Sequence, residues 1–553
     1  MCAVRLARRL GRSHAESNPA DGAPLPRVTV GMGSIQVSHV GWRRPGGAEL
    51  LRDVNFTVGN GDRVALVGAN GVGKSTLMRL IAGDIAATSG TISIDGRLGV
   101  MRQLVGQTDS TVRDLMVSLA PARLQAAAAR LAAAELAAAD DPMRYANALA
   151  EWGDAGGYDA EVFWDTCTTK AAGLTFAELE HRPLRTFSGG EQKRLALEAL
   201  LRSDYDVLLL VEPDNFLDVP GKRWLEAELQ ATRKTVLYVS HDRELLAATA
   251  KKVVTIEAAG AWTHGGAFAT YHAARQAHLE RREHNLSVYE TEVAKLEELV
   301  AEMRRRAKIS ETFAPRLKAA ESRLRQFHAA NDRPEVTRDQ KIDIRLRGAR
   351  TGKRALALQQ VTLHGLTDPF DLEVWYGERV AVLGGNGAGK SHFLRLLAAD
   401  ASVRYDGTVK LGAGVVAGHF NQTHEHPDWV GTTPLEILHS NDVVRGPGMA
   451  MLRRYELQGC ADQPFETMSG GQQARFQILL LELTGATMLL LDEPTDNLDL
   501  VSAEALEAGL AEFQGTVVAV THDRWFLRGF DRFVVFHDDC QVTDHLDRPE
   551  AWR

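Results

Sequence analysis

A set of four motifs occurs twice along the chain in the same order, and the last three motifs keep the same spacing. Each half contains a glycine-rich loop ending in Gly-Lys-Ser, a Ser-Gly-Gly element, an apolar run ending in Glu-Pro, and a Ser/Thr-His-Asp. The serine precedes the glutamate by 24 residues in both halves, and the glutamate precedes the histidine by 29. The residues that define this spacing are Ser188, Glu212 and His241 in the first half, and Ser469, Glu493 and His522 in the second. One such loop can occur by chance, but two ordered sets indicate a duplicated nucleotide-binding unit.

The surroundings of each loop predict an α/β fold. Apolar runs at 64–68 and 380–384 lead directly into the loops, and helices are expected at 77–82 and 393–399. A strand, a glycine loop and a helix in that order form a phosphate-binding context. Further short apolar runs, typical of buried parallel strands, are found at 207–210, 236–239, 488–491 and 517–520.

The domain limits follow from where the motifs end and the residue pattern changes along the chain. Residues 34–265 and 354–553 are expected to be the two nucleotide-binding domains, with a linker at 266–353. The interval from the loop lysine to the Ser-Gly-Gly serine is 114 residues in the first half and 79 in the second. The extra residues, near 115–159, are rich in alanine, leucine and arginine and predict an inserted helical arm. Residues 1–33 are expected to be a disordered tail or the product of an upstream start codon, and either is preferred to a targeting peptide.

The linker has the periodicity of a coiled coil. Apolar residues recur at intervals of 3 and 4, at Leu286, Tyr289, Val293, Leu296, Val300 and Met303, and again at Leu317, Ala320, Leu324 and Phe327. Two helices that fold back on each other are expected, the first at about 267–308. Between positions 304 and 325 there are eight Arg or Lys and two Glu. This charge indicates either a solvated helix face or, by preference, a contact with a phosphate backbone.

Composition excludes several classes of protein. The net charge of -8 argues against a uniformly basic nucleic-acid coat. The four cysteines are scattered and show neither metal-ligand spacing nor a disulfide framework, so a reducing compartment, the cytoplasm, is expected. No uncharged apolar run approaches the roughly 18 residues that span a bilayer.

The loops predict the nucleotide site and its metal. Glycines let backbone N–H groups approach phosphates closely, Lys74 and Lys390 neutralise β- and γ-phosphates, and Ser75 and Ser391 place hydroxyls on Mg²⁺. A glycine turn without a ligand is the alternative, and the companion motifs disfavour it. The candidate binding residues of the loops are Gly68, Ala69, Asn70, Gly71, Val72, Gly73, Lys74, Ser75 and Thr76, and Gly384, Gly385, Asn386, Gly387, Ala388, Gly389, Lys390, Ser391 and His392.

The strand-end residues predict the hydrolytic chemistry. Glu212 and Glu493 are expected at the carboxyl ends of buried strands, where each can orient or deprotonate the attacking water. His241 and His522 end further strands and can contact the γ-phosphate, although a single strand-end histidine is usually structural. Gln103 and Gln422, about 30 residues after each loop lysine, are weaker candidates for sensing metal and γ-phosphate, with ordinary surface glutamines as the alternative.

The Ser-Gly-Gly elements resemble the signature of ATP-binding cassette ATPases. The candidate signature residues are Ser188, Gly189 and Gly190, and Ser469, Gly470 and Gly471. Two cassettes on one chain with a charged helical linker resemble the ABC-F family, and the resemblance covers nearly everything after residue 33. It implies two ATP-binding cassettes joined by a helical hairpin, ATP and Mg²⁺ as ligands, and head-to-tail pairing within one monomer. The first loop would then face the signature at Ser469, and the second loop the signature at Ser188.

The resemblance also implies a partner. Members of the family bind the ribosome near its tRNA exit site, and their linker reaches toward the tRNA; some are translation factors and others dislodge antibiotics. A short linker tip and an arm are more similar to the translation factors. The alternatives are the ATPase part of a membrane exporter and a DNA-associated cassette ATPase.

Two departures from the family pattern distinguish the sites. The family has Asp before the catalytic glutamate; Asp492 keeps it and is the third metal candidate, whereas the first site has Val211. A valine cannot hold the hydration shell of magnesium, so weaker metal binding is expected there. His392 occupies a position where threonine is common, as at Thr76.

Overall fold

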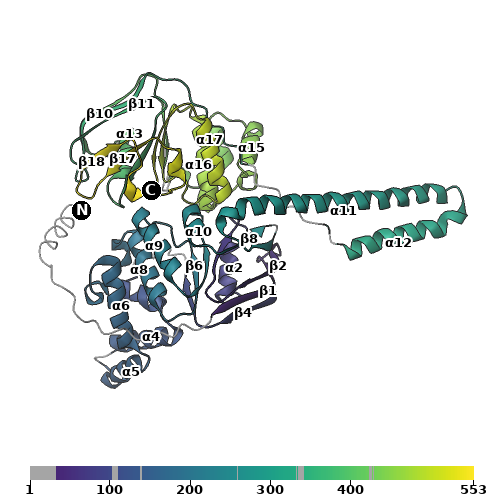
Figure 1. Ribbon diagram of the computed structural model, residues 1–553, viewed down its shortest axis with the longest axis horizontal. Helices are drawn as coiled ribbons and strands as arrows, with labels where there is room; N and C mark the ends of the chain where they lie inside the picture. The colour runs from purple at the N-terminus through teal and green to yellow at the C-terminus, as the bar shows by residue number, and fades with distance from the viewer. Residues whose placement is uncertain are drawn as a thin grey trace.

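The computed structural model describes residues 33–102, 110–137, 140–257, 259–331, 333, 342–421, 426 and 429–552. The expected tail at 1–33, apart from Gly33, lies outside these residues, as do the candidates Gln103 and Gln422. Two α/β bodies are stacked on each other, and a pair of long helices projects from one side (Figure 1).

The first domain is built on a six-stranded sheet. In spatial order its strands are β5 (Leu98–Met101), β6 (Val207–Val211), β7 (Thr235–Val239), β3 (Arg63–Val67), β8 (Lys252–Glu257) and β9 (Gly260–His264). All neighbours are parallel except β8 and β9. The central strands are buried on both faces, which is why they are continuous apolar runs in the sequence. A smaller antiparallel sheet has β2 (Glu49–Val58), β1 (Ser34–Arg43) and β4 (Ser89–Asp95) in that order.

The second domain repeats this plan. Its large sheet has the order β14 (Ala417–Phe420), β15 (Met488–Asp492), β16 (Thr516–Val520), β12 (Arg379–Gly384), β17 (Arg532–Phe536) and β18 (Val542–His545). Its small sheet has the order β11 (Phe370–Trp375), β10 (Arg354–Leu363) and β13 (Tyr405–Leu411). The α/β fold class and the apolar runs expected to be strands are therefore confirmed.

Helices cover the sheets of both domains. Those of the first domain are α2 (Lys74–Ile81), α3 (Val112–Ser118), α6 (Gly157–Ala172), α7 (Phe176–Leu179), α8 (Gly189–Arg202), α9 (Val219–Ala231) and α10 (Arg243–Thr249). Those of the second are α13 (Lys390–Leu397), α14 (Pro434–Ser440), α15 (Arg445–Arg454), α16 (Gly470–Leu483) and α17 (Leu500–Glu512).

The helices after the glycine loops begin earlier than expected. The sequence predicted starts at 77 and 393, but α2 and α13 begin at the loop lysines. Gly73 and Gly389 precede them with φ of 112° and 105°, a left-handed conformation that glycine adopts freely. The lysine and serine of each loop therefore already belong to the first helical turn, whose free N–H groups face the phosphate position.

The linker is a helical hairpin. α11 (Tyr271–Ala307) runs for 37 residues, about 56 Å at 1.5 Å per residue, and α12 (Ala314–Ala330) returns beside it (Figure 1). Leu296, Val300 and Ala320 are buried in the seam between the helices. The rings of Tyr289 and Phe327 lie 5.4 Å apart across it. The heptad pattern predicted this pairing correctly.

The first domain has two helices for which the second has no counterpart in the described residues. α4 (Ala122–Leu136) and α5 (Pro142–Asp154) pack against each other below the first domain in Figure 1. They lie within the segment 115–159 that was expected to form an arm. Among the described residues, no helix is both long enough and apolar enough to span a membrane.

Candidate functional site

Both loop lysines are buried inside their own loops. Lys74 Nζ donates to the carbonyl oxygens of Gly68 and Ala69, at 2.7 and 3.1 Å. Lys390 Nζ donates to those of Gly384 and Gly385, both at 2.9 Å. Burial lowers the pKa of Lys74 to about 8 and also lowers that of Lys390. An ammonium group held this way favours an anionic neighbour, because a phosphate would compensate for its lost hydration.

The two candidate catalytic glutamates have the same strained backbone. Glu212 follows β6 and Glu493 follows β15, and both have φ of 48°. Their backbone N–H groups donate to Val239 O and Val520 O at 2.8 and 2.9 Å, which fixes this conformation. Left-handed non-glycine residues cost energy and cluster at functional sites. Here the strain turns each carboxylate out of the sheet at the carboxyl ends of the strands.

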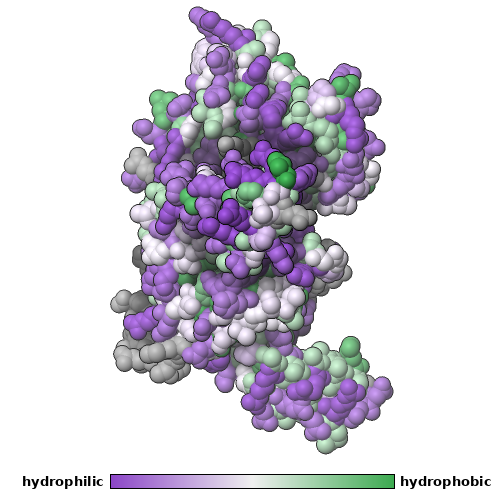
Figure 2. Space-filling model, turned by 90° about the vertical axis from the view of Figure 1, so that its right-hand side faces the viewer, coloured by the Kyte–Doolittle hydropathy of each residue, from purple (hydrophilic) through white to green (hydrophobic). Residues whose placement is uncertain are grey.

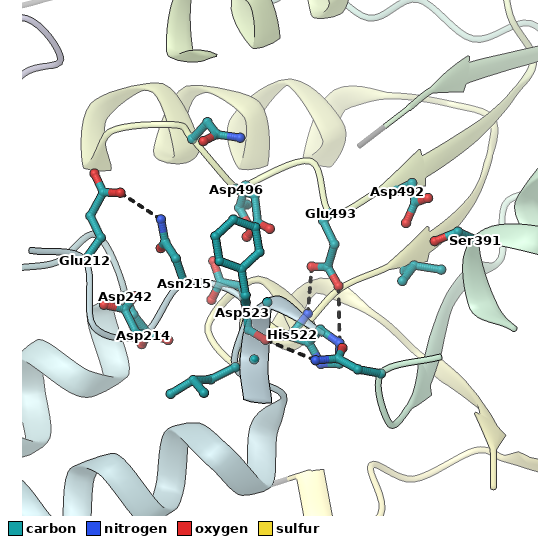
Figure 3. Close-up of a pocket in the computed structure, with 18 of the residues that line it drawn as sticks. Glu212, Asp214, Asn215, Asp242, Ser391, Asp492, Glu493, Asp496, His522 and Asp523 are labelled. Carbon is teal, nitrogen blue, oxygen red and sulfur yellow. Dashed lines mark hydrogen bonds and ion pairs between the residues drawn. The ribbon is translucent and has the colours of Figure 1, made fainter. Parts of the chain in front are cut away.

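In the second site the glutamate and the histidine are in contact (Figure 3). His522 N donates to Glu493 Oε2 at 3.0 Å, and His522 Nε2 lies 3.5 Å from Glu493 Oε1. Burial, with the charge of Asp496, raises the pKa of Glu493 to about 8. Burial, with the charge of Lys390, lowers the pKa of His522 well below its usual value. A glutamate with this pKa is a stronger proton acceptor than a free carboxylate when it is deprotonated.

The first site has a different pattern. Glu212 Oε2 accepts a hydrogen bond from Asn215 Nδ2 at 2.9 Å, on the side of the cavity away from Glu493 in Figure 3. Within the described residues, neither ring nitrogen of His241 has a hydrogen-bond partner. Burial and the charge of Lys74 lower the pKa of His241 to about 3, so its imidazole is neutral. The two sites therefore share the same residue types but not the same contacts.

The metal candidates fit a hard cation at the second site. Asp492 ends β15 beside Ser391 (Figure 3). Burial raises the pKa of Asp492, although a hydrogen bond from Ser391 lowers it. Asp492 Oδ1 is buried and has no hydrogen-bond partner among the described residues. One carboxylate, one hydroxyl and phosphate oxygens are the ligands magnesium prefers. The first site offers Ser75, but Val211 ends β6 without a carboxylate.

The signature of each domain lies against the loop of the other. A Cβ on Gly471 would collide with Asn70 Nδ2, and one on Gly190 would lie 3.2 Å from Asn386 Nδ2. The same asparagines bond across the interface, Asn70 Nδ2 to Asn497 O at 2.9 Å and Asn386 Nδ2 to Phe216 O at 3.0 Å. Ser188 and Ser469 cap α8 and α16, whose N-termini therefore face the opposite loop. The arrangement matches the head-to-tail pairing that the resemblance implied.

A cavity of about 510 Å³ lies between the domains. Its walls include both signatures, both glutamates, both histidines, Asp492 and much of the second loop. The candidates on its walls are Asn70, Gly71, Ser188, Gly189, Gly190, Glu212, His241, Asn386, Gly387, Gly389, Lys390, Ser391, His392, Ser469, Gly470, Gly471, Asp492, Glu493 and His522. Lys74, Ser75 and Thr76 lie outside it, while Gly68, Ala69 and Val72 line a smaller cavity against α11.

Beyond Asn70 and Asn386, several residues that hold the domains together were not singled out from the sequence. Asp499 Oδ2 accepts from Asn70 N at 2.9 Å, across the interface. Arg243 pairs with Glu507, with 3.0 Å between Nη1 and Oε2, and Arg524 pairs with Glu226 at 3.3 Å. All three arrangements join the two domains. A signal was present: the second pair lies 281 positions from the first, the same offset that separates the two signature serines.

Comparison with known proteins identifies the family. The model of the ABC transporter family matches residues 51–215 and 367–496. An "Antibiotic resistance protein" of Mycobacteroides abscessus is 49% identical over 93% of this chain and 99% of its own length. "ABC transporter F family member 5" of Arabidopsis thaliana is 29% identical over 89% of this chain and 74% of its own.

A solved structure shares the fold. The archaeal ribosome recycling factor aABCE1, crystallised with the stalk protein aP1, has a TM-score of 0.54 and 18% identity, covering 90% of this chain and 87% of that one. At this identity the likeness shows the fold alone. Two matched cassettes, facing signatures and relatives along nearly the whole chain show that this protein is an ATPase of the ABC-F family.

Proposed function

We propose that this ATPase acts on the ribosome, with the α11–α12 hairpin as its RNA-contacting element and Mg²⁺-ATP closing the two domains. The observation that supports the proposal best is a basic tip at the far end of a hairpin whose base lies beside the first phosphate loop. Transporter cassettes have no evident use for such a hairpin. The similarity to the "Antibiotic resistance protein" of M. abscessus favours a role in antibiotic resistance over one in general translation.

The base of the hairpin is joined to the first domain beside its phosphate loop. Tyr271 is buried, and its hydroxyl accepts from Thr255 Oγ1 at 3.1 Å. Arg275 Nε donates to buried Glu257 at 2.7 Å. The smaller cavity places this base beside Gly68 and Asp499, the latter from the second domain. A change in how the domains meet at the first loop would therefore alter the direction of α11.

The tip presents cations of two kinds. Arg304 pairs with Glu321 at 2.9 Å and Arg306 with Glu302, so these two are partly neutralised. Arg305 and Lys308 are exposed on the same turn, beside Ile309, which is 87% exposed. The face seen from the hairpin side is mostly hydrophilic (Figure 2). Exposed cations with an apolar neighbour suit a phosphate backbone with accessible bases.

The proposal is tested by trapping the protein with ATP. Glu212→Gln with Glu493→Gln keeps the phosphate loops but removes the carboxylates that activate water. We expect the trapped protein to sediment with ribosomes in ATP and not in ADP. Sedimentation with membranes in place of ribosomes would favour the exporter alternative and contradict the proposal.

A second experiment tests the hairpin tip. In the trapped protein, Arg305→Ala with Lys308→Ala should weaken ribosome binding and flatten its dependence on salt, because phosphate contacts release counterions. The matched control removes two exposed cations from the second domain, Arg404→Ala with Lys410→Ala. An equal effect of both pairs would mean that only net charge matters. A drug-susceptibility assay of cells expressing the wild type would then separate resistance from general translation.

A further inference from the structure

Two buried lysines lie near Glu212 in the first domain at positions where the second domain has alanine. Lys193 on α8 is 2% exposed and Lys222 on α9 is 8% exposed. We call Lys193, Asp214, Lys222 and Asp242 the lysine cluster. At the 281-residue offset that relates the domains, the first three correspond to Ala474, Thr495 and Ala503, and the fourth to Asp523. These three charges are therefore present in the half that has Val211 and absent from the equivalent positions of the other half.

The cluster is connected to the catalytic glutamate of its own domain. Lys193 Nζ donates to Glu212 O at 2.8 Å, and this hydrogen bond stabilises the left-handed backbone of Glu212. Lys222 Nζ forms an ion pair with Asp242 Oδ2 at 2.9 Å. Asp242 Oδ1 in turn accepts from the N–H groups of Glu244 and Leu245 at the start of α10. The buried ammonium of Lys222 is therefore held in one place by its own domain.

From this place Lys222 reaches the second site. Its Nζ donates to His522 O at 3.4 Å, across the domain interface. The N–H group of the same residue donates to Glu493 Oε2 at 3.0 Å. His522 therefore lies between a cation of the first domain and the catalytic carboxylate of the second. The stacking of Trp552 on its ring, with centroids 6.0 Å apart, limits the remaining freedom of the side chain.

We propose that Lys222 is a positioning residue for ATP turnover at the second site, holding the His522 backbone from across the interface and so fixing the Glu493 carboxylate. The inference depends on hydrolysis at Glu493 and not on the ribosome as partner. The lysine cluster makes this contact conditional on domain closure, since Lys222 belongs to one domain and His522 to the other. The second domain has Ala503 at the equivalent position, so the first site receives no such contact from it.

A purely local role explains the geometry less well. A buried lysine needs carboxylates to compensate for lost hydration, and Asp242 and Asp214 provide them within the first domain. The bond to His522 O satisfies one further donor of the ammonium, and it also holds a backbone group that is one hydrogen bond from the catalytic carboxylate. Small displacements of a catalytic base reduce turnover more than they reduce substrate binding.

The test isolates the second site. In a Glu212→Gln background, Lys222→Met should lower kcat about tenfold while the KM for ATP changes less than about twofold. The matched control is Lys234→Met. Lys234 is another buried lysine of the first domain, but its Nζ bonds Leu200 O and Ser203 within that domain. It should leave kcat unchanged.

A second set of substitutions guards against misfolding, because Lys222→Met leaves buried aspartates without their cation. Lys193→Ala, Asp214→Thr and Lys222→Ala together copy the residues that accompany Asp523 in the second domain, and they reduce the cluster carboxylates left without Lys222 from two to one. This variant should show the same loss of kcat. An unchanged kcat in either folded variant, a rise in KM without a fall in kcat, or an equal loss in Lys234→Met would each overturn the proposal.

Discussion

Glu493→Gln should remove more than about nine-tenths of the ATPase activity, whereas Glu212→Gln should remove little. The difference comes from the residue before each glutamate and from the partner of the glutamate. At the second site, Asp492 presents a buried carboxylate oxygen beside Ser391, and Glu493 contacts His522. At the first site, Val211 replaces the aspartate, and Glu212 bonds Asn215 instead of the histidine.

The size of the effect follows from the missing charged contact. A hydrogen bond or contact to a charged group contributes roughly 1.5–3 kcal/mol. Because about 1.36 kcal/mol in the barrier corresponds to a factor of ten, the first site should be roughly 10- to 150-fold slower. It would then supply less than about a tenth of total turnover and act mainly as a nucleotide-held clamp.

Steady-state phosphate release by Glu493→Gln and by Glu212→Gln measures the share of turnover that each site supplies. Nucleotide binding should be checked for both, since the substitutions leave the loops intact. Val211→Asp in the Glu493→Gln background should raise magnesium-dependent hydrolysis at the first site. If Glu493→Gln alone leaves ATPase activity near that of the wild type, the valine does not impair the first site and the reasoning fails.

Two further predictions follow from the site geometry. Burial raises the pKa of Glu493 to about 8, so its carboxyl is protonated below that pH. The kcat/KM for ATP should therefore rise as the pH increases, with an apparent pKa near 8. A flat profile between about pH 6 and pH 9 would contradict the assignment of Glu493 as the base. Gly471→Ala should reduce nucleotide-dependent closure at the first site at least about tenfold, because the added methyl meets Asn70 and lies 2.7 Å from Asn497 O. Gly459→Ala, where a Cβ meets nothing within 4 Å, is its control, and equal effects of the two on closure, measured by protease protection in ATP, would refute the steric argument.

Much of the fold could be predicted because its signals are local. The apolar runs and glycine loops predicted the parallel strands, and the spacing at Leu296 and Val300 predicted the hairpin seam. The helix starts were missed by three residues, since the first turn of a helix after a glycine loop has no apolar periodicity to mark it. The number of charges at the hairpin tip did not predict the ion pair between Arg304 and Glu321, because that pair depends on the register of the two helices.

The sequence by itself determined the composition of each ATP site, because every motif within a domain follows a local strand, turn or helix rule. Only the tertiary structure decided how the sites differ in their contacts. Glu493 meets His522 while Glu212 turns to Asn215, and Lys222 crosses to the opposite domain. Such contacts join residues up to 300 positions apart, and their geometry is fixed by how the two domains pack, which no local pattern encodes.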